Sequence, residues 1–112
     1  MHEYAIAYDL YATSRRTAIE HHASLVKKVS VEVGKMAMVN PEQVTFLFDT
    51  IKEDDPLFKT TLLECHEMSP MSRCSCGYSG EEIFICPQCG ALPEMVKGRE
   101  IVVTSVELEV ED

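Results

Sequence analysis

Positively charged residues are scarce in this chain. Its 112 residues include 10 Lys and Arg against 19 Asp and Glu, which gives a net charge of −9. Nucleic acids are bound by clustered basic side chains, and the basic pairs here are Arg15-Arg16 and Lys27-Lys28. The balance argues against nucleic acid as a main partner, whereas an acidic surface suits protein partners or attracts cations.

Long hydrophobic runs are also missing. No stretch of about 18 apolar residues occurs, so we expect no membrane span. The opening residues, MHEYAIAYDL, lack the basic region and apolar stretch of a secretory signal peptide. We therefore expect a cytoplasmic protein, whose thiols stay reduced and bind metal instead of pairing as disulfides.

Motifs for catalysis are the third absence. The sequence shows no Ser-His-Asp or Cys-His arrangement by spacing and no phosphate-binding loop. The pair Glu81-Glu82 is interpreted as solvated. We therefore do not expect an enzyme.

Hydrophobic spacing predicts two helices. In the first, from about residue 3 to 22, the residues that recur at helical spacing are Tyr4, Ala5, Tyr8, Tyr11, Ala12 and Ile19. The second begins after Asn40, a suitable cap, with Pro41 in the first helical position. Its apolar stripe, which we expect in the core, consists of Val44, Leu47, Phe48 and Ile51.

Alternating apolar residues predict three strands, at 29–33, 60–68 and 101–110. In the last strand one face is expected to carry Val102, Val106, Leu108 and Val110. A cysteine-rich insert, residues 71–96, separates the second and third strands. The order is helix, strand, helix, strand, insert and strand, which indicates an α/β domain with a small inserted lobe that 112 residues can support.

Four of the five cysteines lie between Cys74 and Cys89. Cys86-Pro-Gln-Cys89-Gly is typical of a zinc knuckle, because two intervening residues let both sulfurs reach one ion and the glycine permits the turn. Four thiolates saturate a tetrahedral Zn²⁺ and mark a structural site. Cys76 is expected to be the third zinc ligand, beside Cys86 and Cys89. The fourth is expected to be Cys74, although one residue separates it from Cys76; His66 and Cys65 are the alternatives.

The N-terminus offers a different donor set. A histidine in second position chelates through the α-amine, its own amide and its imidazole, and Glu3 offers a further donor beside Met1 and His2. Such nitrogen-rich sets suit Ni²⁺ or Cu²⁺. A histidine in this position is, however, more often just a polar residue near a terminus.

Several segments together resemble one known family. The opening MHEYAI, the strand-glycine segment VEVGK before a Pro-Glu helix start, and CPQCG with GREIVVTSVELE are similar, in matching order, to the HypA/HybF family of hydrogenase maturation proteins, which deliver nickel. The resemblance spans essentially the whole chain. It implies a three-stranded mixed sheet with two helices and a zinc-ribbon-like hairpin inserted in it.

The resemblance also implies the functional assignments. Nickel would be cargo on Met1, His2 and Glu3, in a domain formed by residues 1–70 and 97–112. Structural zinc would be held by Cys74, Cys76, Cys86 and Cys89 in the insert 71–96. The implied partners are a nucleotide-hydrolysing maturation protein and the large subunit of a [NiFe]-hydrogenase, with urease as an alternative recipient.

Other interpretations stay open. The chain could be a zinc-ribbon module that docks on protein or nucleic acid without nickel cargo. His21-His22 is either a second cargo site or a histidine pair that ends a helix, where positive charge complements the helix dipole. Asn40 is read as a cap, and a cap near the N-terminus could also approach the nickel.

Overall fold

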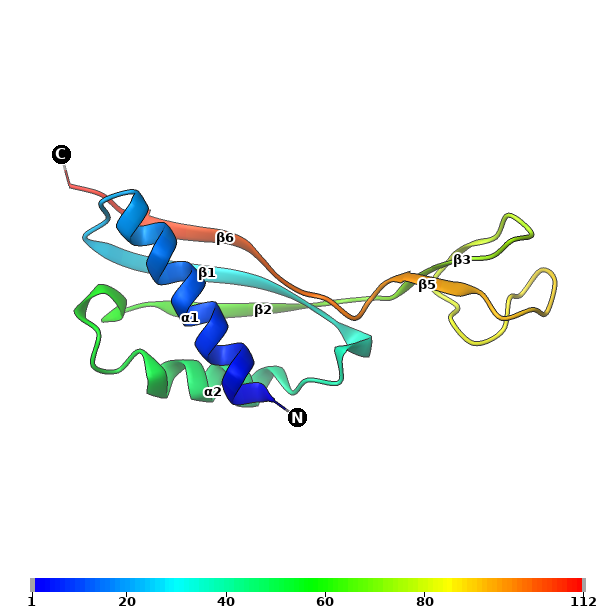
Figure 1. Ribbon diagram of the computed structural model, residues 1–112, viewed down its shortest axis with the longest axis horizontal. Coiled ribbons are helices and arrows are strands. Elements are labelled where there is room, and N and C mark those ends of the chain that lie inside the picture. The colour runs from blue at the N-terminus through cyan, green and yellow to red at the C-terminus, as the bar shows by residue number, and fades with distance from the viewer. Residues whose placement is uncertain (1, 112) are drawn as a thin grey trace.

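The computed structural model describes residues 2–111; Met1 and Asp112 lie outside the described residues. A body of two helices on a sheet continues into a narrow arm, so the molecule measures 57 × 30 × 15 Å along its principal axes (Figure 1). Among residues 2–111 no helix has the length and apolar character needed to cross a membrane.

The body contains α1 and α2, three strands and two short 3₁₀ helices. Their bounds are α1 Glu3–Glu20, β1 Leu25–Gly34, η1 Lys35–Ala37, α2 Pro41–Ile51, η2 Pro56–Phe58, β2 Leu62–Met68 and β6 Ile101–Glu109. The arm holds β3 Met71–Arg73, β4 Ser79–Gly80 and β5 Glu94–Lys97. The predicted fold, with two helices on a three-stranded mixed sheet and an inserted cysteine hairpin, is confirmed. The predicted domain boundaries stay a prediction.

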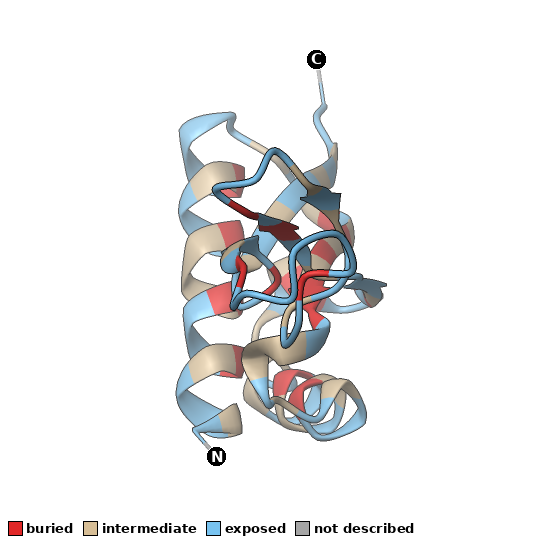
Figure 2. Ribbon diagram, turned by 90° about the vertical axis from the view of Figure 1, so that its right-hand side faces the viewer, coloured by how far each residue is buried: buried red, intermediate tan, exposed pale blue. Residues whose placement is uncertain are grey.

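The main sheet has the order β2-β1-β6, with β1 parallel to β2 and antiparallel to β6. Both helices cover the same face of this sheet, and the buried parts of their ribbons lie on the inner side (Figure 2). The core is formed by Ala7, Leu10, Ala18, Val26, Val29, Val31, Val33, Val44, Phe48, Phe58 and Leu63. All of these residues belong to the body, so the arm contributes no side chain to the core.

The predicted face of the last strand is wrong in part. Val106 and Leu108 pack on the core, but Val102 is 48% exposed and Val103 packs in its place. The pairing with β1 shifts register between Ser30 and Val31, which marks a bulge in β6. One extra residue inverts which side chains face the core, and strict alternation cannot foresee it.

Of the residues that predicted the first helix, Tyr11 packs against the core, but several others do not belong to the buried face. Tyr4, Tyr8 and Ile19 are 61%, 52% and 52% exposed. The sheet is instead contacted by a set of mostly small residues on the other side of α1, namely Ala7, Leu10, Ser14 and Ala18. Small side chains let the helix lie close to the sheet. The larger residues Tyr4, Tyr8 and Ile19 form a second apolar face of α1, which points outward.

A partly buried carboxylate, that of Asp55, ties α1 to the loop after α2. Asp55 Oδ2 accepts hydrogen bonds from the Tyr11 hydroxyl at 2.6 Å and from Arg15 Nε at 3.2 Å, and Asp55 Oδ1 accepts one from the Leu57 N–H at 3.0 Å. Burial alone would raise the pKa of Asp55, but these three donors outweigh it and hold the pKa below its usual value. The contact joins α1 to the loop after α2 through two side chains of the helix.

Backbone packing fixes the junction of body and arm. Gly34 lies so close to the Gly98 carbonyl that a Cβ on Gly34 would stand 2.1 Å from the oxygen. The same carbonyl accepts the Met36 N–H at 2.8 Å. Gly98 has φ +133° and packs against Pro70. The chain therefore passes between the two sheets through a neck with no room for side chains at these glycines.

Candidate metal sites

The described part of the N-terminal motif lies where α1 and α2 begin. His2 precedes α1, has φ 40° and exposes its side chain, and its carbonyl accepts the Ile6 N–H at 3.1 Å. Glu3 Oε2 accepts the Asn40 N–H at 3.3 Å. Met1, the remaining predicted nickel donor, lies outside the described residues.

Asn40 links the two helix starts. Its side chain caps α2 as predicted, accepting the Glu42 and Gln43 N–H groups at 3.0 and 3.3 Å. Its backbone holds the Glu3 carboxylate at the end of α2 where the helix dipole favours negative charge. The sequence predicted Asn40 as a cap that could approach the N-terminus, and in the structure its N–H contacts Glu3, the residue after His2.

The arm brings four cysteines together. Ligand atoms of Cys74, Cys76, Cys86 and Cys89 all lie within 4.8 Å of one another, with Sγ–Sγ distances of 3.5 Å for Cys74–Cys89 and 3.5 Å for Cys76–Cys86. Sulfur atoms about 2.3 Å from one Zn²⁺ stand at such separations in a tetrahedron. Cys74 and Cys86 are buried and the other two are exposed, so the group is closed on one side. The cluster indicates structural zinc.

Each half of the cluster is a tight turn. In the first, Gly77 N–H donates to the Cys74 carbonyl at 3.0 Å, and Gly77 has φ +102°. In the second, Gly90 N–H donates to the Cys86 carbonyl at 2.9 Å, and Gly90 has φ +77°. The first turn shows how one intervening residue still brings Cys74 into the group. Ligation by Cys74 stays a prediction.

Neighbouring groups in the cluster change the pKa values of the Cys86 and Cys89 thiols. Burial alone would raise the pKa of Cys86, but the N–H groups of Cys89 and Gln88 and the sulfurs of Cys76 and Cys89 outweigh it and lower the pKa to about 6. The Ala91 N–H alone would lower the pKa of Cys89, but the three other cysteines raise it to about 12. A thiolate at Cys86 therefore opposes a second one at Cys89, and a bound cation would offset this repulsion.

The alternative zinc ligands lie elsewhere. Cys65 is half-buried in β2, where its sulfur stands 3.9 Å from Thr45 Oγ1, and burial raises the pKa of its thiol. His66 Nε2 contacts Glu64 Oε1 at 2.7 Å. Neither belongs to the cysteine group of the arm. The fourth thiol of the group comes from Cys74.

The histidine pair ends α1. His21 Nδ1 lies 2.9 Å from the Thr17 carbonyl, and His22 has φ +54° in the turn that follows. Within residues 2–111, the groups of three or more metal-binding side chains include neither histidine. The contact of His21 fits the helix-end interpretation.

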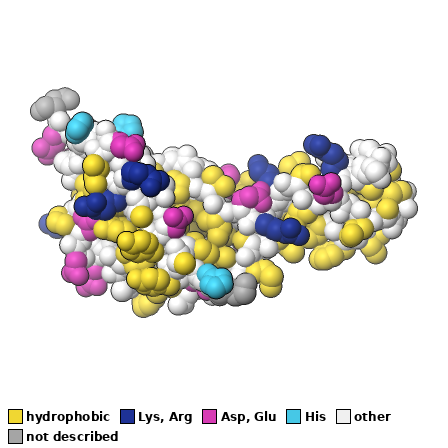
Figure 3. All heavy atoms as spheres, in the orientation of Figure 1, with side chains coloured by type: hydrophobic (Ala, Val, Ile, Leu, Met, Phe, Trp, Pro, Cys, Tyr) yellow, Lys and Arg dark blue, Asp and Glu magenta, His cyan; other side chains and the backbone are white. Residues whose placement is uncertain are grey.

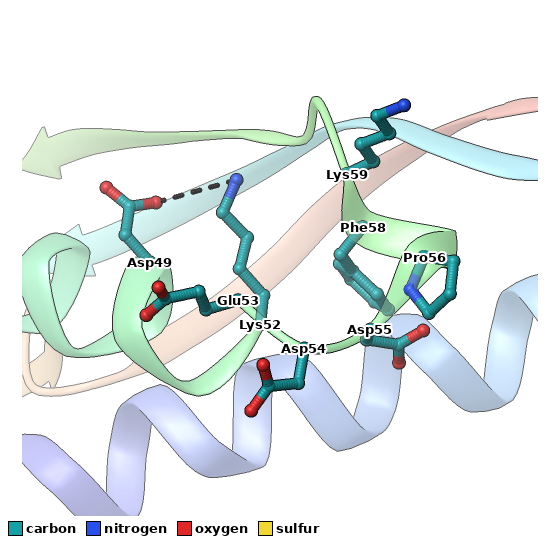
Figure 4. A pocket seen from close by; sticks show the side chains of 8 residues that line it. All are labelled: Asp49, Lys52, Glu53, Asp54, Asp55, Pro56, Phe58 and Lys59. Carbon is teal, nitrogen blue, oxygen red and sulfur yellow. Dashed lines mark ion pairs between the residues drawn. The ribbon is translucent and has the colours of Figure 1, made fainter.

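A hollow of about 400 Å³ opens beside the acidic loop after α2 (Figure 4). Carboxylates of Asp49, Glu53 and Asp54 line it, and Lys52 Nζ stands 3.8 Å from Asp49 Oδ1. These carboxylates do not converge on one point in Figure 4. We assign this hollow no ligand.

Comparison with known proteins places the chain in a family. Residues 1–108 match the family model described as "Hydrogenase/urease nickel incorporation, metallochaperone, hypA". The hydrogenase maturation factor HypA of Methanocella arvoryzae is 36% identical over 114 residues, covering 98% of this chain and 100% of the relative. HypA of Helicobacter hepaticus is 32% identical over 117 residues, covering 99% of each chain.

Solved structures share the fold. The solution structure of the Ni metallochaperone HypA from Helicobacter pylori superposes with a TM-score of 0.76 at 21% identity, covering 99% of this chain and 100% of that one. A solution structure titled HypA protein gives 0.78 at 21% identity, covering 99% and 98%. With the match over nearly the whole sequence, the four-thiol cluster and the shared fold, this chain belongs to the HypA family of hydrogenase and urease nickel-incorporation metallochaperones.

Proposed function

We propose that this protein binds Ni(II) at its N-terminus through Met1, His2 and Glu3 and delivers it during maturation of [NiFe]-hydrogenase. The observation that carries the proposal is the position of His2, an exposed imidazole directly before α1 in a member of a nickel-incorporation family. An amine, an amide and an imidazole are donors that suit Ni(II). A terminal site with few ligands can release its metal to a partner.

The zinc site has a different task in this proposal. Cys74, Cys76, Cys86 and Cys89 hold a permanent Zn²⁺ that stabilises the arm, because four thiolates leave no open coordination position. The two metals are kept apart, since the cluster lies in the arm and the N-terminus lies at the body (Figure 1). A saturated zinc also gives no catalytic water, so the protein acts as a carrier and not as an enzyme.

The partners follow from the role of the family. A nucleotide-hydrolysing maturation protein would act with this carrier, and the hydrogenase large subunit would receive the metal. The family description also names urease, which makes a urease the alternative recipient.

Calorimetric titration with Ni²⁺ tests the proposal on untagged protein that begins with Met1. We expect one tight equivalent in the unaltered protein and in His21→Ala, which removes an exposed histidine at the far end of the same helix. His2→Ala should lose this equivalent, while about one zinc per chain stays bound in all three proteins. Equal nickel binding by His2→Ala would refute the N-terminal site.

A further inference from the structure

One face of α1 is apolar yet turned away from the body. We call it the outer ridge and define it as Tyr4, Tyr8, Ala12, Arg15, Arg16 and Ile19. Apart from the adjacent Arg15 and Arg16, successive positions are three or four residues apart, so they form one stripe along the helix. Three large side chains of the stripe are more than half exposed. A helix with two apolar faces is ordinarily buried on both faces. In α1 the rest of the chain covers one apolar face and leaves the other exposed.

The composition of the outer ridge is that of a protein interface. Tyrosine and arginine are enriched where interfaces carry most of their binding energy. The Tyr8 and Tyr11 rings stand 6.1 Å apart and, with the ridge residues Ala12, Arg15 and Ile19, line a hollow of about 360 Å³. A groove that runs along a helix accepts a second helix.

The charge of the ridge indicates the partner. The chain has a net charge of −9, yet the ridge carries Arg15 and Arg16, with Glu20 at its far end. Arg15 is bound to Asp55, whereas Arg16 makes no ion pair within the described part of the chain. Figure 3 shows basic side chains beside hydrophobic ones on the face that α1 covers. Arg16 is therefore available to a carboxylate on another molecule.

We propose that the outer ridge docks an acidic amphipathic helix of a partner protein. The apolar stripe of that helix lies against Tyr8, Ala12 and Ile19, and its carboxylates face Arg16. Tyr4 stands two residues after His2, so the docked helix reaches the N-terminal end of α1. A second copy of the ridge suits it less well as the partner, because it offers one carboxylate, that of Glu20, beside two arginines of its own.

A synthetic helical peptide provides the probe. It carries Leu at i, i+3, i+4 and i+7 with flanking Glu, and a matched peptide carries Lys in place of every Glu. Each is titrated into ¹⁵N-labelled full-length zinc-loaded protein and followed by amide chemical shifts. We expect the acidic peptide to shift residues 4–19 and to bind at least about fivefold more tightly than the basic one, because like charges at an interface oppose binding.

Matched variants locate the contact. Tyr8→Ala and Arg16→Glu should each weaken the acidic peptide at least about fivefold. Phe46→Ala, which removes an exposed aromatic side chain from α2, should leave its affinity unchanged. The amide spectrum of each variant checks that it is folded, and nickel titration of Tyr8→Ala checks that the proposed cargo site is intact.

Three results would overturn the proposal. They are equal binding of both peptides, shifts confined to another surface, and no shift at millimolar peptide. Analytical sedimentation tests whether the ridge binds a second copy of this chain. A dimer that Tyr8→Ala abolishes would assign the ridge to that second copy instead. None of these results depends on whether nickel binds at His2.

Discussion

Removal of zinc should unfold the arm and leave the body folded. In the arm, the buried apolar residues are two of the four cysteines, Cys74 and Cys86, together with Pro93, whereas all core residues belong to the body. Structural zinc sites contribute about 10–16 kcal/mol of binding free energy. Because no apolar core replaces this term in the arm, its order depends on the metal. The main sheet and both helices keep their core without it.

The variant Cys86→Ser tests whether the arm can unfold while the body stays folded. We expect zinc content to fall from about one to near zero per chain, amide signals of residues 71–97 to collapse into the range of unfolded chains, and signals of α1, β1 and α2 to persist. Ser75→Ala, a change at an exposed serine between two of the cysteines, should keep zinc and the arm signals. Loss of the body signals together with those of the arm in Cys86→Ser would refute the reasoning.

The remaining predictions concern the body. Asp55→Ala should lower the free energy of unfolding by about 1–3 kcal/mol in urea titrations, because it leaves the Tyr11 hydroxyl without its acceptor. In a Tyr11→Phe background, Asp55→Ala should have a smaller further effect. Folding lowers the pKa of Asp55, so its carboxylate contributes fully to the free energy of unfolding above the unfolded-state pKa of about 3.9, and this contribution is lost as pH falls through the folded-state pKa. The stability of Asp55→Ala should therefore fall less steeply with pH below about pH 4 than that of the unaltered protein. Asn40→Ala should cost about 1 kcal/mol through the lost α2 cap, and a change below about 0.3 kcal/mol would contradict the cap. Gly34→Ala should cost about 1–3 kcal/mol, because its methyl group meets the Gly98 carbonyl; wild-type stability would contradict the tight neck.

Much of the fold could be predicted because its signals are local. The Asn40-Pro41 start of α2 and its apolar stripe act within a few turns of one helix, and the structure contains both. The cysteine spacing likewise predicted that the sulfurs would gather. Turn geometry brings together the two cysteines of each half within a few residues, and the structure shows the two halves joined in one group.

Other features depend on contacts between distant segments. The bulge opposite Ser30 inverts one part of β6, and it arises from pairing between strands that lie about seventy residues apart. Likewise, helical spacing in α1 could not say which of two apolar faces would be buried. The sheet selected the face with small side chains, Ala7, Ser14 and Ala18, because it allows close approach.

The sequence by itself therefore determined which residues can bind metal and which segments become the two α-helices and the three strands of the main sheet, since both depend on side-chain chemistry and short-range geometry. Tertiary structure alone decided that Asn40 meets Glu3, that Cys74 instead of Cys65 or His66 joins the other three cysteines, and that Tyr8 and Arg16 face outward. These outcomes were fixed by how whole elements pack, because packing brings together residues that no local pattern relates.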